Sequence, residues 1–349
     1  MRGSIRYCSS ILRPDKGVRP RQLLAIALVA VLLAPGTFVR DAPPGRGLSD
    51  FSISPLAAQT PARWPEGLTL EGAWQLESAN QRFGGLSAMA LESEATFLAW
   101  SDRGDLMRLP LPGSTGAAQF LDLPPARELT EGQDIESVVF DVETGTSWLG
   151  HETPNIVRRL DPDGTSHIVA VPEMLDWGAN AGAEAMVRLP DGRFLALAEK
   201  RAQGALFAGD PVLHRQPLLF AFDRPAGWSP TDAAILPDGR MLILLRKVER
   251  RFPPFRAMLA LADPDEIVAG KRWQLARFVE LTLPDLMDNY EALAVKQEED
   301  GALTIWVLSD DNLSAFQRTL LLRLRWQQDA KTQTAREDIP RAPLNASTP

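Results

Sequence analysis

The chain has 349 residues, of which 45% are hydrophobic and 23% charged, as in an ordinary soluble globular protein. The net charge is −8, but residues 1–36 carry six basic residues and one acidic residue, so the remainder holds 31 basic and 44 acidic residues, a net charge of −13. Because so acidic a surface repels phosphate backbones and anionic lipid headgroups, nucleic acid is excluded as a partner.

The N-terminal 36 residues have the pattern of a bacterial export signal. A basic stretch that ends at Arg21 precedes an apolar run, residues 23–34, whose length of 12 residues suits a signal peptide and is short for a membrane span of about 20. Small residues offer two cleavage points, at 34–36 and at 56–58. We predict a periplasmic or secreted protein. The alternative is an uncleaved signal anchor, through which alone we expect contact with a membrane.

The segments that flank the expected domain have little periodicity. Residues 37–62 contain Pro43-Pro44-Gly45 and predict a flexible tether, and the polar residues 329–349 predict a disordered tail. The single cysteine, Cys8, lies before the apolar run and is lost on cleavage. Disulfides, thiolate metal sites and cysteine nucleophiles are therefore excluded from the domain, which we place at 63–328.

Five segments of the domain repeat one plan, a β-hairpin with polar or charged residues at both ends. The clearest runs from Asn289 through a turn at 297–301 and returns to Ser309-Asp310-Asp311-Asn312. Its counterparts are spaced by 49, 48, 48 and 59 residues, at Ser87, Glu136, Glu184, Asp232 and Glu291. Two of these hairpins also share the turn Leu-Pro-Asp-Gly-Arg, at 189–193 and 236–240. A constant period in this range indicates a repeat architecture.

Each repeat has room for four short strands, such as 86–91, 96–100, 106–111 and 119–123 in the first. Four-stranded antiparallel units of about 48 residues predict an all-β fold, a β-propeller. Five repeats are visible, and the longer gap before Glu291 leaves six blades possible. The last repeat ends at strand 319–326 without a fourth strand, so we expect the N-terminal strand 68–76 to close the ring.

With these residues in view, the chain resembles the phytase-like family, whose members are described as having the esterase-like activity of phytase. The resemblance covers residues 84–326. It rests on Asn289-Tyr290-Glu291-Ala292-Leu293-Ala294 with 309–312 and 317–321, on Pro230-Thr231-Asp232-Ala233 with 236–240 and Arg246, and on Gly85-Leu86-Ser87 with 101–104. It implies a secreted bacterial β-propeller and, more weakly, hydrolysis of phosphoesters or other esters.

In a propeller the first strand of each blade lines the central channel, so the acidic residues that begin these strands should meet at one mouth. Crowded carboxylates repel one another, and Ca²⁺, which takes six to eight oxygen ligands, relieves that repulsion. We therefore predict a Ca²⁺ site. Its expected ligands are Glu136, Glu184, Asp232, Glu291, Asp102, Asp310 and Asp311, with Glu152 and Glu199 just outside. The alternative is that these carboxylates cap strand ends. Superposing the two shared turns also matches Glu184 with Thr231 and moves Asp232 one position on, to the other face of its strand.

Basic residues at the same strand ends suggest recognition of an anionic substrate. We predict that Glu136 or Glu291 acts as the base and that Arg103 and Arg246 bind the anion, with His151, Lys200 and Lys247 as further substrate-binding residues. For each basic residue the alternative is a solvated ion pair with a neighbouring acid. No G-x-S-x-G, H-E-x-x-H or phosphate-binding glycine loop is present.

The first functional hypothesis is therefore an exported, metal-dependent phosphoesterase that acts on a small anionic ester at the channel mouth, as a monomer. A Ca²⁺-dependent lactonase or carboxylesterase is the second. The third is a non-catalytic propeller that binds a ligand or an envelope partner, which would be favoured if Arg103, Lys200 and Arg246 neutralise the carboxylates.

Overall fold

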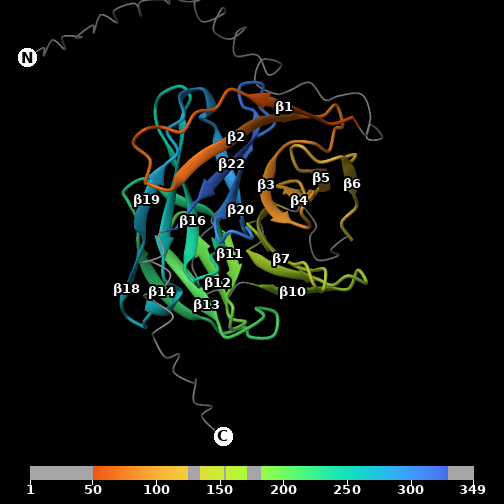
Figure 1. Cartoon of the computed structure of the whole chain (residues 1–349). Coiled ribbons are helices and arrows are strands. Elements are labelled where there is room, and N and C mark those ends of the chain that lie inside the picture. Colours follow the sequence, from red (N-terminus) through yellow and green to blue (C-terminus); the bar gives the residue numbers. More distant parts are fainter. Residues whose placement is uncertain (1–49, 125–133, 153–154, 171–181, 329–349) are drawn as a thin grey trace, which may run out of the picture. The chain divides into compact units, whose positions relative to one another are not determined.

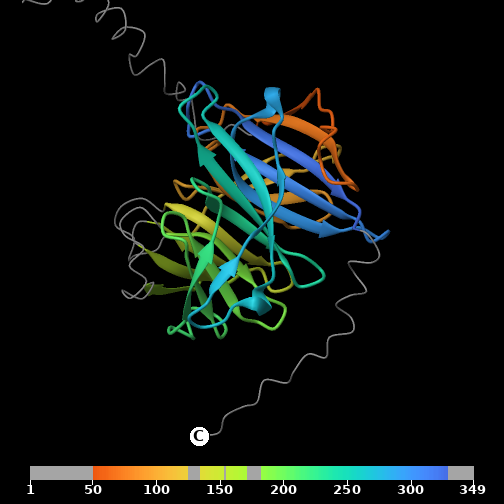
Figure 2. The same cartoon turned by 90° about the vertical axis from the view of Figure 1, so that its left-hand side faces the viewer.

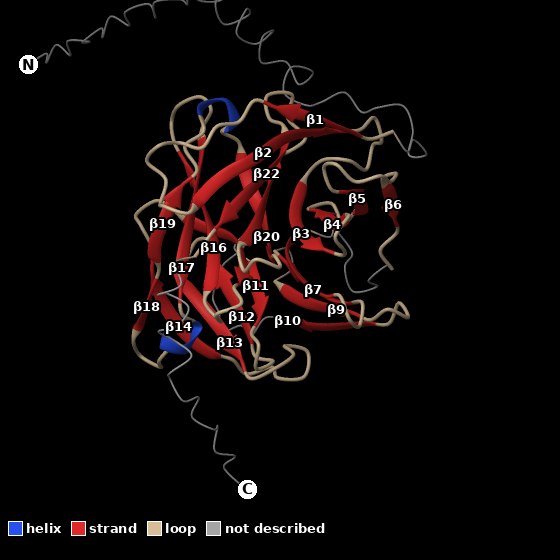
Figure 3. Ribbon diagram, viewed as in Figure 1, coloured by secondary structure: helices blue, strands red, loops and turns tan. Residues whose placement is uncertain are grey.

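A computed structural model describes residues 50–124, 134–152, 155–170 and 182–328. The chain divides after Asp41, and every described residue belongs to the part that follows. The predicted export signal (1–36) and tail (329–349) lie outside the described residues. Within the described ranges no helix is long and apolar enough to cross a membrane. The helical elements there are two short 3-10 helices, η3 (Pro264–Glu266) and η4 (Pro284–Leu286) (Figure 3).

The strands form five sheets, which are the blades of a β-propeller (Figure 1). The first blade contains β3 (Leu86–Leu91), β4 (Thr96–Ser101), β5 (Leu106–Pro110) and β6 (Gln119–Leu121). The second contains β7 (Ile135–Asp141), β8 (Thr146–His151), β9 (Ile156–Leu160) and β10 (Ser166–Ala170). The third contains β11 (Ala183–Arg188), β12 (Phe194–Ala198), β13 (Gln203–Phe207), β14 (Leu218–Asp223) and β18 (Arg272–Gln274).

The fourth blade contains β15 (Ser229–Ile235), β16 (Met241–Val248), β17 (Phe255–Ala262) and β19 (Ala276–Glu280). The fifth contains β20 (Asn289–Gln297), β21 (Leu303–Asp310), β22 (Thr319–Trp326), β2 (Leu68–Glu77) and β1 (Ser52–Leu56). The first strands, β3, β7, β11, β15 and β20, contact one another in that order, and β20 returns to β3. In the view turned by 90°, the green, teal and blue sheets of the third, fourth and fifth blades can be told apart as distinct groups of strands (Figure 2). The predicted all-β propeller is thus confirmed, with five blades.

The ring closes as the sequence predicts. Strand β2 pairs antiparallel with β22 from Leu68↔Trp326 to Leu76↔Thr319, so the N-terminal strand completes the last blade. The tether prediction is wrong for Ser52–Leu56, because these residues form β1 and pair with β2. Pro55 lacks an N–H group, which an edge strand tolerates, and this proline conceals the strand in the sequence.

The long gap before Glu291 holds two additional strands and no sixth blade. Strand β18 pairs in parallel with β14 and extends the third blade to five strands. Strand β19 pairs with β17 and completes the fourth blade.

The shared Leu-Pro-Asp-Gly-Arg turns have the same geometry in both blades. In each, the aspartate accepts the backbone N–H of the arginine two residues on, at 3.0 Å, and the glycine has a positive φ, +88° at Gly192 and +85° at Gly239. Because glycine adopts this backbone conformation without steric penalty, these two turns set the register of β11–β12 and β15–β16.

Apolar side chains form a separate cluster at each of the five blade interfaces. Between the third and fourth blades, for example, Val187 and Leu195 pack with Ile243 and Met258. The other four clusters join the remaining pairs of neighbouring blades. Because every blade is held on both sides, the strand ends at the centre of the ring have fixed positions.

Candidate metal centre at one end of the ring

A β-bulge interrupts the first strand of every blade at the same place. The register shifts at one residue in each of β3, β7, β11, β15 and β20. A bulge leaves one residue unpaired and redirects its side chain. We call these the bulge positions; they are Ser87, Glu136, Glu184, Thr231 and Glu291.

A second set of equivalent residues lies at the ends of the second strands. Each is the residue of the second strand that comes directly after the last pair before the bulge. In the fifth and fourth blades this residue is still paired, as Asn289↔Asp310 and Ser229↔Arg246. We call these the strand-end positions; they are Asp102, Glu152, Glu199, Arg246 and Asp310. The two sets together place seven carboxylates and one guanidinium at one end of the ring.

The carboxylates of these positions are close enough to alter one another's ionisation. Burial and, after it, the charges of Glu184 and Glu291 raise the pKa of Glu136 to about 11. The pKa of Glu184 is raised by burial and then by Glu199 and Glu152. The structure therefore brings Glu136, Glu184 and Glu291 to one centre; their catalytic and metal-binding roles stay predictions.

The charge cluster continues around the ring. The pKa of Asp310 is raised by burial and by the charge of Glu291. Burial, against the opposing charge of the neighbouring Arg103 and with smaller contributions from Glu291 and Asp134, raises the pKa of Asp102 to about 6. Oxygen Oδ1 of Asp102 is buried and has no hydrogen-bond partner among the described residues.

Two sets of three carboxylates have the spacing of metal ligands. One oxygen each from Asp134, Glu136 and Glu152 lie within 4.8 Å of one another, and the same holds for Glu152, Glu184 and Glu199. Glu152 belongs to both sets. The side chains of Asp134, Glu136 and Glu184 make no hydrogen bond or ion pair with another described residue, although Glu184 is only 6% exposed. An unpaired buried carboxylate is unfavourable unless a proton or a cation compensates for it.

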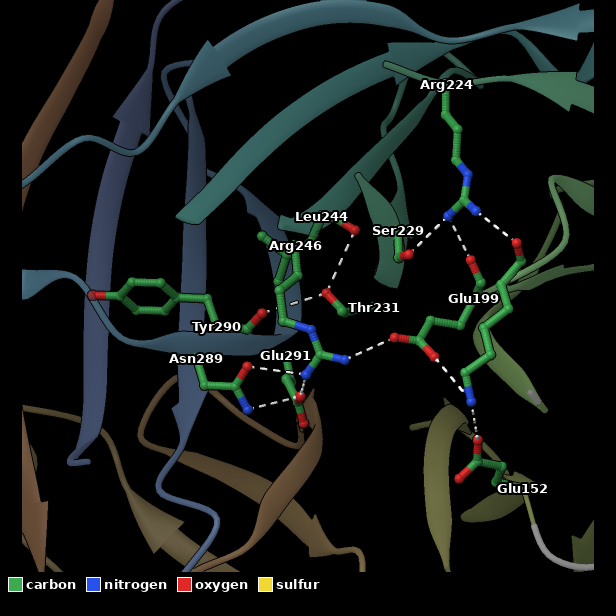
Figure 4. A network of polar contacts seen from close by, with 11 residues as sticks. Glu152, Glu199, Arg224, Ser229, Thr231, Leu244, Arg246, Asn289, Tyr290 and Glu291 are labelled. Carbon is green, nitrogen blue, oxygen red and sulfur yellow. Dashed lines mark hydrogen bonds and ion pairs between the residues drawn. The ribbon is translucent and has the colours of Figure 1, made fainter. Parts of the chain in front are cut away.

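The fourth blade contributes the one basic side chain at the strand-end positions (Figure 4). Arg246 donates to Glu291, to Oδ1 of Asn289 at 2.9 Å and to Oε1 of Glu199 at 2.9 Å. Asn289 also donates to Oε1 of Glu291 at 2.8 Å. Burial lowers the pKa of Arg246, but the charges of Glu291 and Glu199 more than offset this effect and leave it raised. Arg246 is thus a fixed cation that links the third, fourth and fifth blades.

Lys200 lies beside the cluster in a looser arrangement. Its Nζ is 4.0 Å from Oε1 of Glu152 and 3.8 Å from Oε2 of Glu199, and its side chain is 54% exposed. The backbone carbonyl of Lys200 accepts a 2.8 Å hydrogen bond from Arg224, which also binds Oγ of Ser229 at 2.8 Å (Figure 4). Arg224 therefore holds this segment against the fourth blade, while the ammonium group lies at long ion-pair distance from the two glutamates.

Two predicted metal ligands do not join the cluster. Asp232 follows the bulge residue Thr231, and its fully buried carboxylate accepts the N–H groups of Leu293, at 2.6 Å, and Ala233, at 2.7 Å. It joins the fourth blade to the fifth, as the superposition of the shared turns indicated. Asp311 accepts the N–H groups of Gly85 and Leu313, both at 3.0 Å, and so joins the fifth blade to the first.

Three predicted basic residues lie apart from the cluster or within a strand. Arg103 donates to the carbonyls of Gln81 and Arg82 at 3.3 Å and is 3.9 Å from Asp105. Lys247 pairs with Glu249 at 3.1 Å, on the opposite side of β16 from Arg246. His151 is fully buried in β8, opposite Ile135. The structure thus leaves Arg246 and Lys200 as the predicted basic residues that contact the carboxylates.

Sequence reasoning missed Asp134 and placed Glu152 and Glu199 outside the ligand set. Asp134 precedes β7 as Asn289 begins β20, and its backbone adopts a positive φ of +35°. The repeat alignment could have found it, because the residue two before each bulge position faces the same end of the ring.

The comparisons with known proteins identify the family of this chain. The family model "Phytase-like: Esterase-like activity of phytase" matches residues 81–313. The chain belongs to the phytase-like family. No curated protein matches it.

The solved structures to which this phytase-like chain is similar are distant in sequence. A virginiamycin B lyase from Staphylococcus aureus is 10% identical, with a TM-score of 0.41, over 80% of this chain and 100% of that one. A putative gluconolactonase is 14% identical, with a TM-score of 0.43, over 83% and 100%. An endo-arabinase from Bacteroides thetaiotaomicron is 9% identical, with a TM-score of 0.47, over 71% and 96%.

Proposed function

We propose that this chain is a metal-dependent hydrolase of small anionic esters, with phosphomonoesters as its first candidate substrates and Ca²⁺ as its metal. The observation that carries the proposal is the pair of carboxylate sets at the end of the ring, in which Asp134, Glu136 and Glu184 have no described partner. Membership of a family described by esterase-like activity supports it.

The donor atoms of the cluster fit a hard cation. Every candidate ligand is a carboxylate oxygen, which suits Ca²⁺, Mg²⁺ or Mn²⁺ better than Zn²⁺. Glutamates from different blades also form an irregular set, which the flexible coordination of Ca²⁺ accepts more readily than the octahedron of Mg²⁺. Asp134, Glu136 and Glu152 would hold the ion.

A bound cation supplies a Lewis acid that polarises the ester and lowers the pKa of water. The residues around it divide the remaining work. Glu291 is oriented by Asn289 and Arg246, and burial raises its pKa despite the opposing charge of Arg246. A positioned carboxylate with a raised pKa suits a general base that takes a proton from the attacking water. Lys200, half exposed beside Glu152 and Glu199, would bind the anionic oxygens of the substrate.

A Ca²⁺-dependent lactonase or carboxylesterase is the second candidate. Of the basic residues predicted to bind phosphate, Arg103 and Lys247 pair with acids outside the two carboxylate sets, and Arg246 is already bound to Glu291 and Glu199. A neutral or singly charged ester needs fewer cations than a phosphomonoester does, so this observation favours the second candidate. The non-catalytic propeller loses support, because Arg246 and Lys200 leave three carboxylates without a partner.

The location and the partners remain proposals from the sequence. The basic and apolar pattern of residues 1–36 supports export to the periplasm or the medium, with an uncleaved anchor as the alternative. We expect a monomer that binds a small ester and no nucleic acid.

The test combines binding with turnover. Ca²⁺ is titrated calorimetrically into the chelator-treated full chain, and hydrolysis of p-nitrophenyl phosphate, p-nitrophenyl acetate and a γ-lactone is then followed with Ca²⁺ or with EGTA. We expect Ca²⁺ binding and Ca²⁺-dependent turnover, which Glu136→Gln abolishes. Glu94→Gln, in a carboxylate far from the cluster that pairs with Lys296, serves as the matched control. Turnover that EGTA leaves unchanged, or the absence of both binding and turnover, contradicts the proposal.

A further inference from the structure

The two carboxylate sets overlap in a single residue. Glu152 lies within 4.8 Å of Asp134 and Glu136 on one side and of Glu184 and Glu199 on the other. A carboxylate has two oxygens and can bind two cations at once. Sites with two metal ions about 3.5–4 Å apart are common in enzymes that cleave phosphate esters. The arrangement therefore has the topology of a two-cation centre with Glu152 between the two positions.

The charge at this end of the ring exceeds what one divalent cation compensates. Eight carboxylates meet there, and two basic side chains, Arg246 and Lys200, contact them. The carboxylates are Asp102, Asp134, Glu136, Glu152, Glu184, Glu199, Glu291 and Asp310. The formal charge is −6 when all are ionised, so one divalent cation leaves a net charge of −4 and two leave −2. Burial in a poorly hydrated site makes this residual charge expensive.

A second observation, independent of the charge count, points to a ligand at the position near Glu184. This side chain is 6% exposed, extends into the cluster, and makes no hydrogen bond or ion pair with the described residues. Asp232, a carboxylate buried to a similar degree in the next blade, is bound by two backbone N–H groups. The fold therefore satisfies a buried carboxylate where that carboxylate is structural, and it leaves Glu184 to be satisfied from outside.

We propose that this end of the ring binds two divalent cations side by side, one between Asp134, Glu136 and Glu152 and the other between Glu152, Glu184 and Glu199. Glu152 bridges the two positions. This inference rests on the proposed function and deepens it, because a pair of cations fits two of the three non-bridging oxygens of a phosphomonoester better than the single carbonyl of a lactone. In that reaction a water oxygen attacks phosphorus, the bond from phosphorus to the alcohol oxygen breaks, and the alcohol leaves with a proton while inorganic phosphate remains.

The two positions differ in affinity. Glu199 in the second set already accepts from Arg246 at 2.9 Å, and Lys200 is 3.8 Å from its other oxygen. In the first set, Glu152 lies 4.0 Å from Lys200, and no described arginine donates to its members. The first set therefore has fewer positive groups nearby than the second. The first cation therefore binds between Asp134, Glu136 and Glu152, and the second binds more weakly.

The experiment counts cations and locates them. Equilibrium dialysis of the chelator-treated full chain against Ca²⁺ should give two ions per chain, in two steps at least tenfold apart in Kd. Asp134→Asn should remove the tighter step and Glu184→Gln the weaker one, each leaving one ion per chain, and Glu152→Gln should weaken both steps at least tenfold. Glu94→Gln should bind as the parent does. With Mn²⁺ as the probe, electron paramagnetic resonance of the parent should show the signature of two interacting ions, and Glu152→Gln should lose it.

The outcomes separate this inference from the proposed function. One ion per chain, with Asp134→Asn and Glu184→Gln acting on the same step, overturns the two-cation centre and leaves a single-metal hydrolase. No bound ion overturns both. Two ions without magnetic interaction place the second cation elsewhere and also overturn the inference. Circular dichroism in chelator checks that each variant is folded, which we expect because each substitution removes a buried charge.

Discussion

The two sides of the ring treat equivalent carboxylates in different ways. In the fourth and fifth blades, Glu291 is bound by Arg246 and Asn289, and Asp232 by two backbone N–H groups. In the second and third blades, Asp134, Glu136 and Glu184 have no such partner among the described residues. Both sides have the same strand geometry and a bulge at the same place, so the backbone does not cause the difference. For Glu291 the cause is the residue at the strand-end position, which is an arginine in the fourth blade and an acid in the other four. For Asp232 the cause is its place one residue past the bulge, where two backbone N–H groups face it.

This difference assigns separate roles to the two sides. A buried carboxylate with donors contributes to the fold, whereas one without donors reduces stability until a cation or a proton arrives. We therefore expect substitutions on the paired side to destabilise the protein under all conditions. On the unpaired side we expect the sign of the effect to depend on metal and pH.

The largest expected effect comes from Arg246. Arg246→Met leaves Glu291 and Glu199 buried without their cation, and loss of one partner of a buried pair costs about 3–5 kcal/mol. Urea denaturation at neutral pH measures the free energy of unfolding. Lys247→Met is the matched control, because the neighbouring Lys247 forms an exposed pair with Glu249 worth at most about 1 kcal/mol. A loss below about 1 kcal/mol for Arg246→Met would show that Arg246 does not hold this side together.

Metal removal should affect the other side. With Ca²⁺ at about one hundred times its Kd, binding to the folded state alone raises the free energy of unfolding by about 2.7 kcal/mol. Glu152→Gln should lose at least half of this gain, because Glu152 belongs to both carboxylate sets and a tenfold weaker Kd removes about 1.4 kcal/mol. Thermal unfolding with Ca²⁺ and with EGTA measures the gain, and Glu94→Gln should retain it. If the parent melts at the same temperature in both, the unpaired side has no cation to lose.

The pH dependence of the chelated protein should reveal the protons that replace the metal. Burial raises the pKa of Glu136 to about 11 and raises those of Glu184 and Glu152 above the ordinary value of 4.5. At pH values between the ordinary pKa of 4.5 and the raised pKa of each group, the folded protein holds a proton that the unfolded chain has released. The free energy of unfolding therefore falls as pH rises above about 5. The slope is about 1.4 kcal/mol per pH unit for each such proton.

Glu184→Gln removes one of these groups and should flatten the slope by up to one proton. Denaturation in EGTA from pH 5.5 to 8 measures both slopes. Asp141→Asn, at an aspartate outside the cluster whose pKa is lowered, should leave the slope in this range unchanged. If the free energy of unfolding of the chelated parent rises with pH instead, the unpaired carboxylates are ionised in the folded protein and their pKa values are not raised.

The smallest expected change in stability is at Lys200. Its side chain is half exposed and its ion pairs are long, so Lys200→Met should alter the free energy of unfolding by less than about 1 kcal/mol. The same substitution removes a positive charge beside Glu152 and Glu199, and Ca²⁺ should then bind several-fold more tightly. Calorimetry measures the affinity, and the KM for p-nitrophenyl phosphate should rise in the same variant. Weaker Ca²⁺ binding would show that Lys200 orders the site instead of competing for it.

The repeat made much of the fold predictable. Hairpin period, shared turns and the missing strand of the last repeat are local features of the sequence, and they predicted a β-propeller with five visible repeats and closure by β2. The prediction failed at β1, because Pro55 and the lack of alternation concealed an edge strand whose stability comes from pairing with β2. It left the blade number open because β18 pairs with a strand about 50 residues earlier, and no local pattern shows that.

For the site, the sequence determined that acids recur at the strand ends of most repeats, and a nearly constant period through strands of one kind must bring such residues to a common end. It also contained the clue that Thr231, and not Asp232, is the counterpart of Glu184. Only the tertiary structure decided which acids are satisfied. Whether a carboxylate meets a guanidinium, an amide or nothing depends on neighbouring blades, and a one-residue bulge is enough to turn a side chain from the blade interface to the centre of the ring.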